Sequence, residues 1–176
     1  EIYNVSVSLM KFASVAHAKA ENTATVSTLL KSNDFKTDNL NINSYLNSSA
    51  AADSTGTNVS LGISVDGVKA VAKDTSTMDI QISGTNTVTG TADIVGKHDA
   101  NTSADLSAFN FSLIAGGAST TVDTELTANT TGNIGGNFNA AIGKINLNTT
   151  RESSVSKSSG GGGIIAVNDP DVTNKL

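Results

Sequence analysis

The sequence predicts an all-β fold, a parallel β-helix (β-solenoid) built from about 3.4 repeats of 52 residues. Three observations support this prediction. A short motif returns every 52 residues, as Val7-Ser8-Leu9, Val59-Ser60-Leu61 and Phe111-Ser112-Leu113, and a fixed period is typical of stacked arrays. Small or apolar residues alternate with polar ones, as they do in β-strands. The composition, rich in Ser, Thr, Asn, Ala and Gly with 15% charged and 4% aromatic residues, fits strands separated by tight corners.

We expect one solenoid segment over residues 1–176, with repeats at approximately 5–56, 57–108 and 109–160 and a partial repeat at 161–176. The clearest strand lies within 68–82. Its inward positions are mostly small or apolar, and they are Val68, Ala70, Ala72, Asp74, Ser76, Met78, Ile80 and Ile82. The same parity recurs one repeat before and one repeat after this segment. Because a slip of one residue would turn every side chain over, preserved parity indicates a preserved register.

A corner is expected next, at Ser32-Asn33-Asp34, Gly84-Thr85-Asn86 and Gly136-Asn137-Phe138, since these residues favour tight turns. A second apolar peak follows, at Leu40 and Ile42, at Ile94, and at Ile145 and Leu147. The last pair is one residue out of register, which predicts a small insertion or deletion. A polar stretch then leads back to the Ser-Leu motif, and the glycine run 160–163 is expected to form a wide corner.

Stacking would place equivalent residues over one another, roughly 4.8 Å apart. We expect a structural ladder of large apolar residues along the stack, formed by Leu9, Leu61, Leu113 and Ile165 and by Ile42 and Ile94. Glu21, Lys73 and Glu125 would form a column of alternating charge. Each repeat could form one broad coil or two coils of half its length. We favour two, with a bend at Asn22 and Asp74, because an uninterrupted strand face of about 15 residues would be unusually long.

The charge and the cysteine count exclude several classes of function. A net charge of −5 argues against a nucleic-acid partner, which needs a basic face. No run approaches the roughly 18 apolar residues of a membrane-spanning helix. The absence of cysteine excludes disulfides, Cys-based zinc sites and a thiol nucleophile.

The repeats resemble those of large secreted bacterial adhesins of the filamentous-haemagglutinin and leukotoxin-like type. The segments that carry the resemblance are Ser14-Val15-Ala16-His17-Ala18-Lys19-Ala20, Gly67-Val68-Lys69-Ala70-Val71-Ala72 and Leu40-Asn41-Ile42-Asn43. The resemblance implies a right-handed parallel β-helix, export across the outer membrane, and adhesion or display at the cell surface. It also implies an internal fragment, and it carries over no catalytic residue.

We expect no metal or cofactor site. His17 and His98 lie at no metal-ligand spacing from another candidate ligand, and both are expected at the surface. Asp169-Pro170-Asp171 is expected to be a structural turn. Glycan-cleaving β-helices use paired carboxylates. The candidate carboxylates here are Asp66, Asp74, Asp79, Asp93 and Asp99.

The expected function is therefore a structural and adhesive shaft segment of an exported bacterial surface or fibre-forming protein, without catalysis. Its partners would be a host or neighbouring cell surface, and a second copy stacked end to end into fibres. The alternative is a glycan-binding or glycan-cleaving β-helix of the tailspike kind. An ice-binding solenoid is a weaker alternative, because the rank formed by Thr23, Thr25, Thr75 and Thr77 is broken at Asn129.

Overall fold

The computed structural model describes residues 1–8, 14–162 and 165–176. Within these ranges it is an all-β structure of ten strands, without a helix and so without one that is long and apolar enough to cross a membrane. The strands are β1 (Ile2–Ser8), β2 (Ser14–Asn22), β3 (Thr25–Thr37), β4 (Leu40–Ser60), β5 (Ile63–Asp74), β6 (Thr77–Ser112), β7 (Ala115–Leu126), β8 (Asn129–Ile134), β9 (Asn137–Gly162) and β10 (Ile165–Lys175). The Ala-rich segment around Val15 to Ala20, the most helix-like stretch of the sequence, lies in β2.

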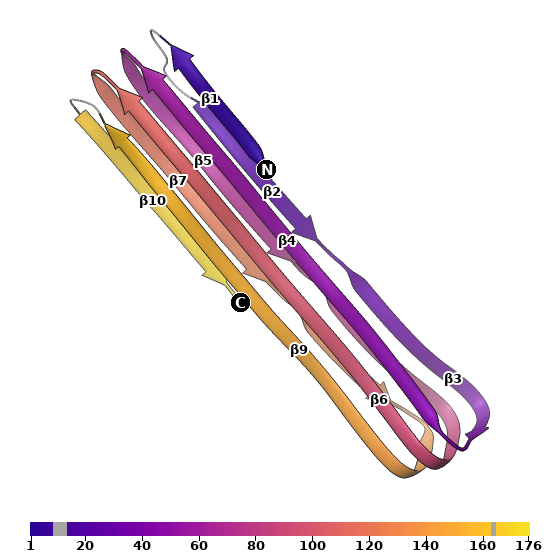
Figure 1. The fold of residues 1–176 in the computed structure, drawn as a ribbon. Helices are drawn as coiled ribbons and strands as arrows, with labels where there is room; N and C mark the ends of the chain where they lie inside the picture. Colours follow the sequence, from indigo (N-terminus) through magenta and orange to yellow (C-terminus); the bar gives the residue numbers. More distant parts are fainter. Residues whose placement is uncertain (9–13, 163–164) are drawn as a thin grey trace.

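The strands form two layers that run along one long direction and meet at sharp turns (Figure 1). The first layer contains β2, β3, β5, the start of β6, β7, β8 and β10. The second contains β1, β4, the rest of β6, and β9. Because β6 rounds the turn, one sheet includes strands of both layers, in the order β1-β4-β6-β3 with β8 and β9 also paired to β6. The other sheet has the order β10-β7-β5-β2.

Every described strand pairing is parallel, and most of them join residues 52 positions apart. Ser14 lies opposite Asp66, Leu40 opposite Ala92, and Ile63 opposite Ala115. One repeat therefore adds one level to each layer. The preference for two coils in each repeat was wrong. Residues 23–24, 75–76 and 127–128 interrupt the strands, but the chain continues in the same layer there, with Thr75 N donating to Asn22 O at 2.9 Å.

The predicted inward face of 68–82 is confirmed. Its eight residues are all buried, from Met78 at 0% to Val68 at 3% exposure. The second layer supplies the opposite wall, so that Ala50, Ala104 and Leu106 share one core cluster with Ala70 and Val122. Small residues dominate this core, which lets two nearly flat layers lie close together over a long distance.

The strands are longer than the sequence suggested. β4, β6 and β9 continue through the polar stretches, because Ser48, Ser54 and Thr102 take buried inward positions there. Gly160–Gly162, expected in a corner, also belong to β9 and lie opposite Phe109–Phe111; Gly163 lies outside the described residues. The one-residue offset at Ile145 and Leu147 is confirmed, since the register changes between Val88 and Thr91 and then pairs Ile94 with Ile145.

The corner predicted at Gly84 and Gly136 is present, and it is the bend at which the chain passes from the first layer to the second. Gly84 and Gly136, which are one repeat apart, have φ values of 92° and 80°, in a region that favours glycine. A Cβ on Gly84 would also lie 1.7 Å from the carbonyl oxygen of Ser32 in the preceding repeat. The bend therefore needs glycine for its backbone angle and for the close approach of two levels.

We predict that Gly84→Ala lowers the free energy of unfolding by at least about 1–2 kcal/mol, because the left-handed conformation and the contact with Ser32 both oppose a methyl group. Gly143→Ala is the matched control, because a Cβ there meets nothing within 4 Å, and we expect a change within about 0.5 kcal/mol. Urea denaturation of both variants makes the comparison. Equal midpoints would show that the bend does not constrain residue 84.

Candidate functional site: the faces and ends of the stack

The predicted leucine ladder does not form a buried spine. Leu61 lies between β4 and β5, and Leu113 lies between β6 and β7. Their side chains are 55% and 53% exposed. Ser60 and Ser112, one position earlier, are buried instead, because neighbouring residues of a strand point to opposite faces. Ile165 begins β10 and lies opposite Ala115, with 61% exposure, and Leu9 lies outside the described residues.

The second predicted ladder is present. Ile42 lies directly opposite Ile94, and Ile94 lies opposite Ile145. Ile94 is 2% exposed and packs with Ile80 and Ile82 from the first layer. The isoleucine column thus joins the two layers near the bend.

The two histidines take opposite positions. His17 is exposed, as predicted. His98 was expected at the surface but is fully buried, because its position in β6 has inward parity. Its Nε2 lies 2.9 Å from Ser76 Oγ, which lies 2.8 Å from Ser48 Oγ, and its Nδ1 lies 3.4 Å from Thr130 Oγ1. These residues alternate between layers and link three consecutive levels through the core.

The candidate carboxylates do not converge on one site. Asp66 and Asp74 are buried in β5, where Asn58 Nδ2 donates to Asp66 Oδ1 and Asn22 Nδ2 to Asp74 Oδ2, each at 3.3 Å. Asp79 lies on the outward face of the first layer and accepts a hydrogen bond from Thr131. The other two candidates, Asp93 and Asp99, are at outward positions of the second layer. The paired arrangement needed for glycoside cleavage is not assembled from these five residues.

The remaining candidates are placed as follows. Asp169-Pro170-Asp171 lies within β10 and is not a turn. In the threonine rank Thr25 lies opposite Thr77 and Thr77 opposite Asn129, so the rank is broken as the sequence indicated. Among the described residues no three His, Asp or Glu side chains gather where they could hold a metal ion.

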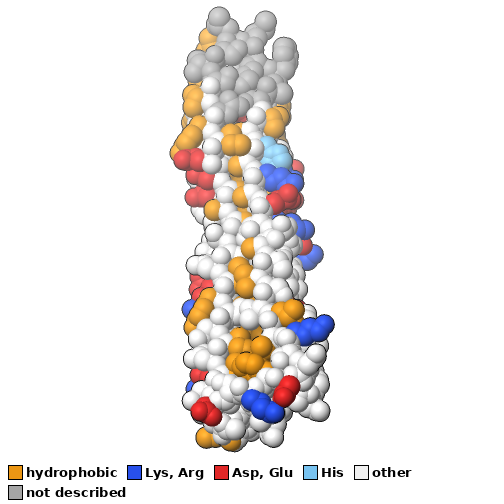
Figure 2. Space-filling view, turned by 90° about the vertical axis from the view of Figure 1, so that its right-hand side faces the viewer, with side chains coloured by type: hydrophobic (Ala, Val, Ile, Leu, Met, Phe, Trp, Pro, Cys, Tyr) orange, Lys and Arg blue, Asp and Glu red, His pale blue; other side chains and the backbone are white. Residues whose placement is uncertain are grey.

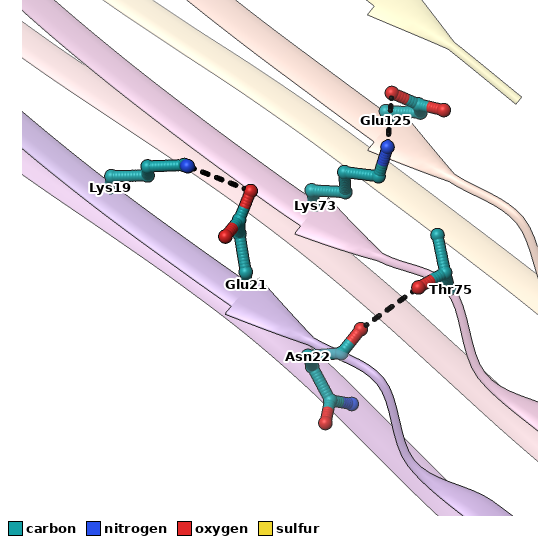
Figure 3. A network of polar contacts seen from close by, with 6 residues as sticks. All are labelled: Lys19, Glu21, Asn22, Lys73, Thr75 and Glu125. Carbon is teal, nitrogen blue, oxygen red and sulfur yellow. Dashed lines mark hydrogen bonds and ion pairs between the residues drawn. The ribbon is translucent and has the colours of Figure 1, made fainter.

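Charged side chains pair on the outward faces. Lys73 Nζ lies 3.2 Å from Glu125 Oε2, and Lys19 Nζ lies 2.8 Å from Glu21 Oε1; both ion pairs are drawn in Figure 3. The predicted column of alternating charge is thus joined between Lys73 and Glu125, while Glu21 pairs within β2. The hydrogen bond from Lys19 lowers the pKa of Glu21.

The second layer carries a similar outward pair. Lys97 Nζ lies 2.6 Å from Asp99, and this hydrogen bond raises the pKa of Lys97 and lowers that of Asp99. Exposed pairs of this kind contribute little to stability. They add charge to outward faces that also expose apolar side chains, among them Tyr45, which is 63% exposed and lies opposite Lys97.

The two ends of the stack present strand edges with no partner among the described residues. At the N-terminal end these edges belong to β1, β2, β3 and the Leu40–Asp53 part of β4. Figure 2 shows the face on the β3 side, where hydrophobic side chains follow the middle and charged side chains lie toward the margins. At the other end, near the bend, an open hollow of about 470 Å³ is lined by Ile134, Phe138, Ile145 and neighbouring residues.

The comparisons with known proteins identify no relative. No family model, no curated protein and no solved structure matches the chain. Its function is therefore inferred from its own geometry.

Proposed function

We propose that this chain is a structural and adhesive shaft segment of an exported bacterial surface or fibre-forming protein, without a catalytic role. In this proposal the two layers close into a right-handed parallel β-helix with one coil for each repeat. The observation that carries the proposal is the parallel register, in which strands of the array lie on counterparts about one repeat away. Such an array is lengthened by adding units, with no new kind of contact.

The character of the two faces of each strand supports a shaft. Most inward positions carry apolar or small polar residues, so much of the core has the same character from one level to the next. Outward positions carry amide and charged side chains, with Asn43 Nδ2 donating to Asn41 Oδ1 at 2.8 Å and Lys97 paired with Asp99. In the proposed role these outward faces meet a glycan or a protein on a host or neighbouring cell.

The proposal predicts that the array accepts further repeats in its interior. A second copy of residues 57–108 is inserted directly after residue 108, so that each inserted strand has a counterpart on both sides. We expect each copy to lengthen the stack by about 4.8 Å and to increase the denaturant m-value, which follows the surface buried on folding. A series with one, two and four copies, measured by small-angle scattering and urea denaturation, makes the test.

A control insertion contains the same segment in scrambled order and should leave both quantities without a regular increase. If the true repeats behave like the scrambled ones, the unit is not a stacking unit and the proposed shaft is wrong.

A further inference from the structure

The strands of the first layer are interrupted at residues 23–24, 75–76 and 127–128. At each interruption an equivalent backbone carbonyl is placed to accept a hydrogen bond from the next level. Ala24 O accepts the N–H of Thr77 at 2.9 Å, and one repeat later Ser76 O accepts the N–H of Asn129 at 3.1 Å. In the next repeat the equivalent acceptor is Ala128 O. The carbonyls of Ala24 and Ser76 thus each receive a backbone N–H from the level that follows.

At Ala128 O the donor is the side chain of Arg151. Its Nε lies 3.1 Å from Ala128 O, and its Nη2 donates to the same oxygen. The side chain reaches this carbonyl from β9 in the second layer, and so it crosses the open end between the two layers. A side-chain donor thus occupies the acceptor that a backbone N–H uses in the two preceding levels.

Arg151 also differs in kind from its column. It lies opposite Ala100, which lies opposite Ser48, and both of these are buried inward residues. Next to it Leu126 and Ala128, which form a core cluster with Ala100, are 1% and 0% exposed. The arginine contacts water on its other side, since its side chain is exposed.

Lys157 repeats this arrangement further along β9. It lies opposite Leu106, which is fully buried, and its Nζ donates to Thr120 O in the first layer at 3.3 Å. Burial lowers the pKa of Lys157. Asp171 and Asp169 oppose this shift in the pKa of Lys157 by their charge. A further level stacked on β9 would remove both cations from water, which is unfavourable unless each charge is fully compensated.

We propose that Arg151 is an edge cap, which closes the C-terminal face of the array by satisfying Ala128 O and by placing a charge where the next level would stack. Lys157 assists it. Inward-pointing charges are a known means of preventing strand addition at a sheet edge. The N-terminal face has no such residue at its described inward positions in β2, β3 and β4. The two ends are therefore unequal, and end-to-end stacking over β9 is blocked. This inference rests on the stacking that the proposed function requires.

The test adds the level that Arg151 is proposed to exclude. Residues 75–112 are appended after Leu176, so that the copy of Thr77 would bring its N–H to Ala128 O. The extended chain is compared with the same chain carrying Arg151→Ala and Lys157→Leu, which restore the residues of the preceding repeat. The control is the extended chain with Lys31→Leu and Lys175→Ala, which also loses two positive charges but loses them from outward positions.

We expect the appended segment to stay unprotected in the extended chain and in the control. In the Arg151→Ala, Lys157→Leu chain we expect amide exchange in that segment to slow by at least about tenfold. If the appended segment is equally protected in all three chains, the proposed cap is wrong. It is also wrong if the segment is unprotected in all three. The insertion series, which adds repeats away from this end, judges the shaft itself independently.

Discussion

Replacing Leu106 with alanine is expected to lower the free energy of unfolding by about 2–5 kcal/mol, the range for a large aliphatic side chain removed from a packed core. Leu106 is fully buried and packs in one cluster with Val68, Val122 and the alanines of both layers. Because the backbone ladders of the two sheets hold the layers in place, the core cannot collapse easily into the space, which places the loss toward the upper part of that range.

Leu61→Ala is the matched control for this prediction. The two leucines belong to the same repeat, but Leu61 is 55% exposed, so its truncation should change stability by no more than about 0.5 kcal/mol. Urea denaturation followed by circular dichroism measures both. A larger loss for Leu61 than for Leu106 would mean that the Ser-Leu column, and not the 106 position, holds the core.

This pair of leucines also shows how far the sequence alone could lead. Period and register were predictable, because 68–82 keeps its parity over three repeats and the bend recurs at Gly84 and Gly136. The orientation of the Ser-Leu motif was not, because Ser60 and Leu61 recur together and the spacing cannot tell which of them faces inward. Hydrophobicity favoured the leucine, whereas the inward parity of β4 continues to the serine.

The polar stretches were misjudged for a related reason. Alternation is visible only where the two faces differ in polarity, and in the second layer Ser and Thr occupy inward as well as outward positions. Buried hydroxyl groups such as those of Ser48 and Ser76 bond to each other across the layers, and this pairing depends on a contact between distant segments. The edge cap was hidden for the same reason, since Arg151 reveals its role only through its contact with Ala128 in the opposite layer.

The buried histidine gives the second large effect. His98→Ala is expected to lower the free energy of unfolding by about 3–5 kcal/mol, because it leaves a cavity and removes the partner of buried hydroxyl groups. Ser76 would keep its bond to Ser48, but Thr130 would lose His98 and keep only the hydroxyl of Thr149, which donates to it at 2.6 Å. The loss therefore combines packing with broken hydrogen bonds along three levels.

His98→Leu separates these two contributions. Leucine is the natural residue at the equivalent position one repeat earlier, where Leu46 lies opposite His98 and is 7% exposed. It fills the space without the hydrogen bonds, so we expect it to retain most of the stability and to lose only about 1–2 kcal/mol. Equilibrium denaturation of the wild-type chain and both variants gives the two differences. If His98→Leu lowers the free energy of unfolding as much as His98→Ala, the hydrogen bonds of His98 join the levels at this position. Filling of the core by an apolar side chain is then secondary there.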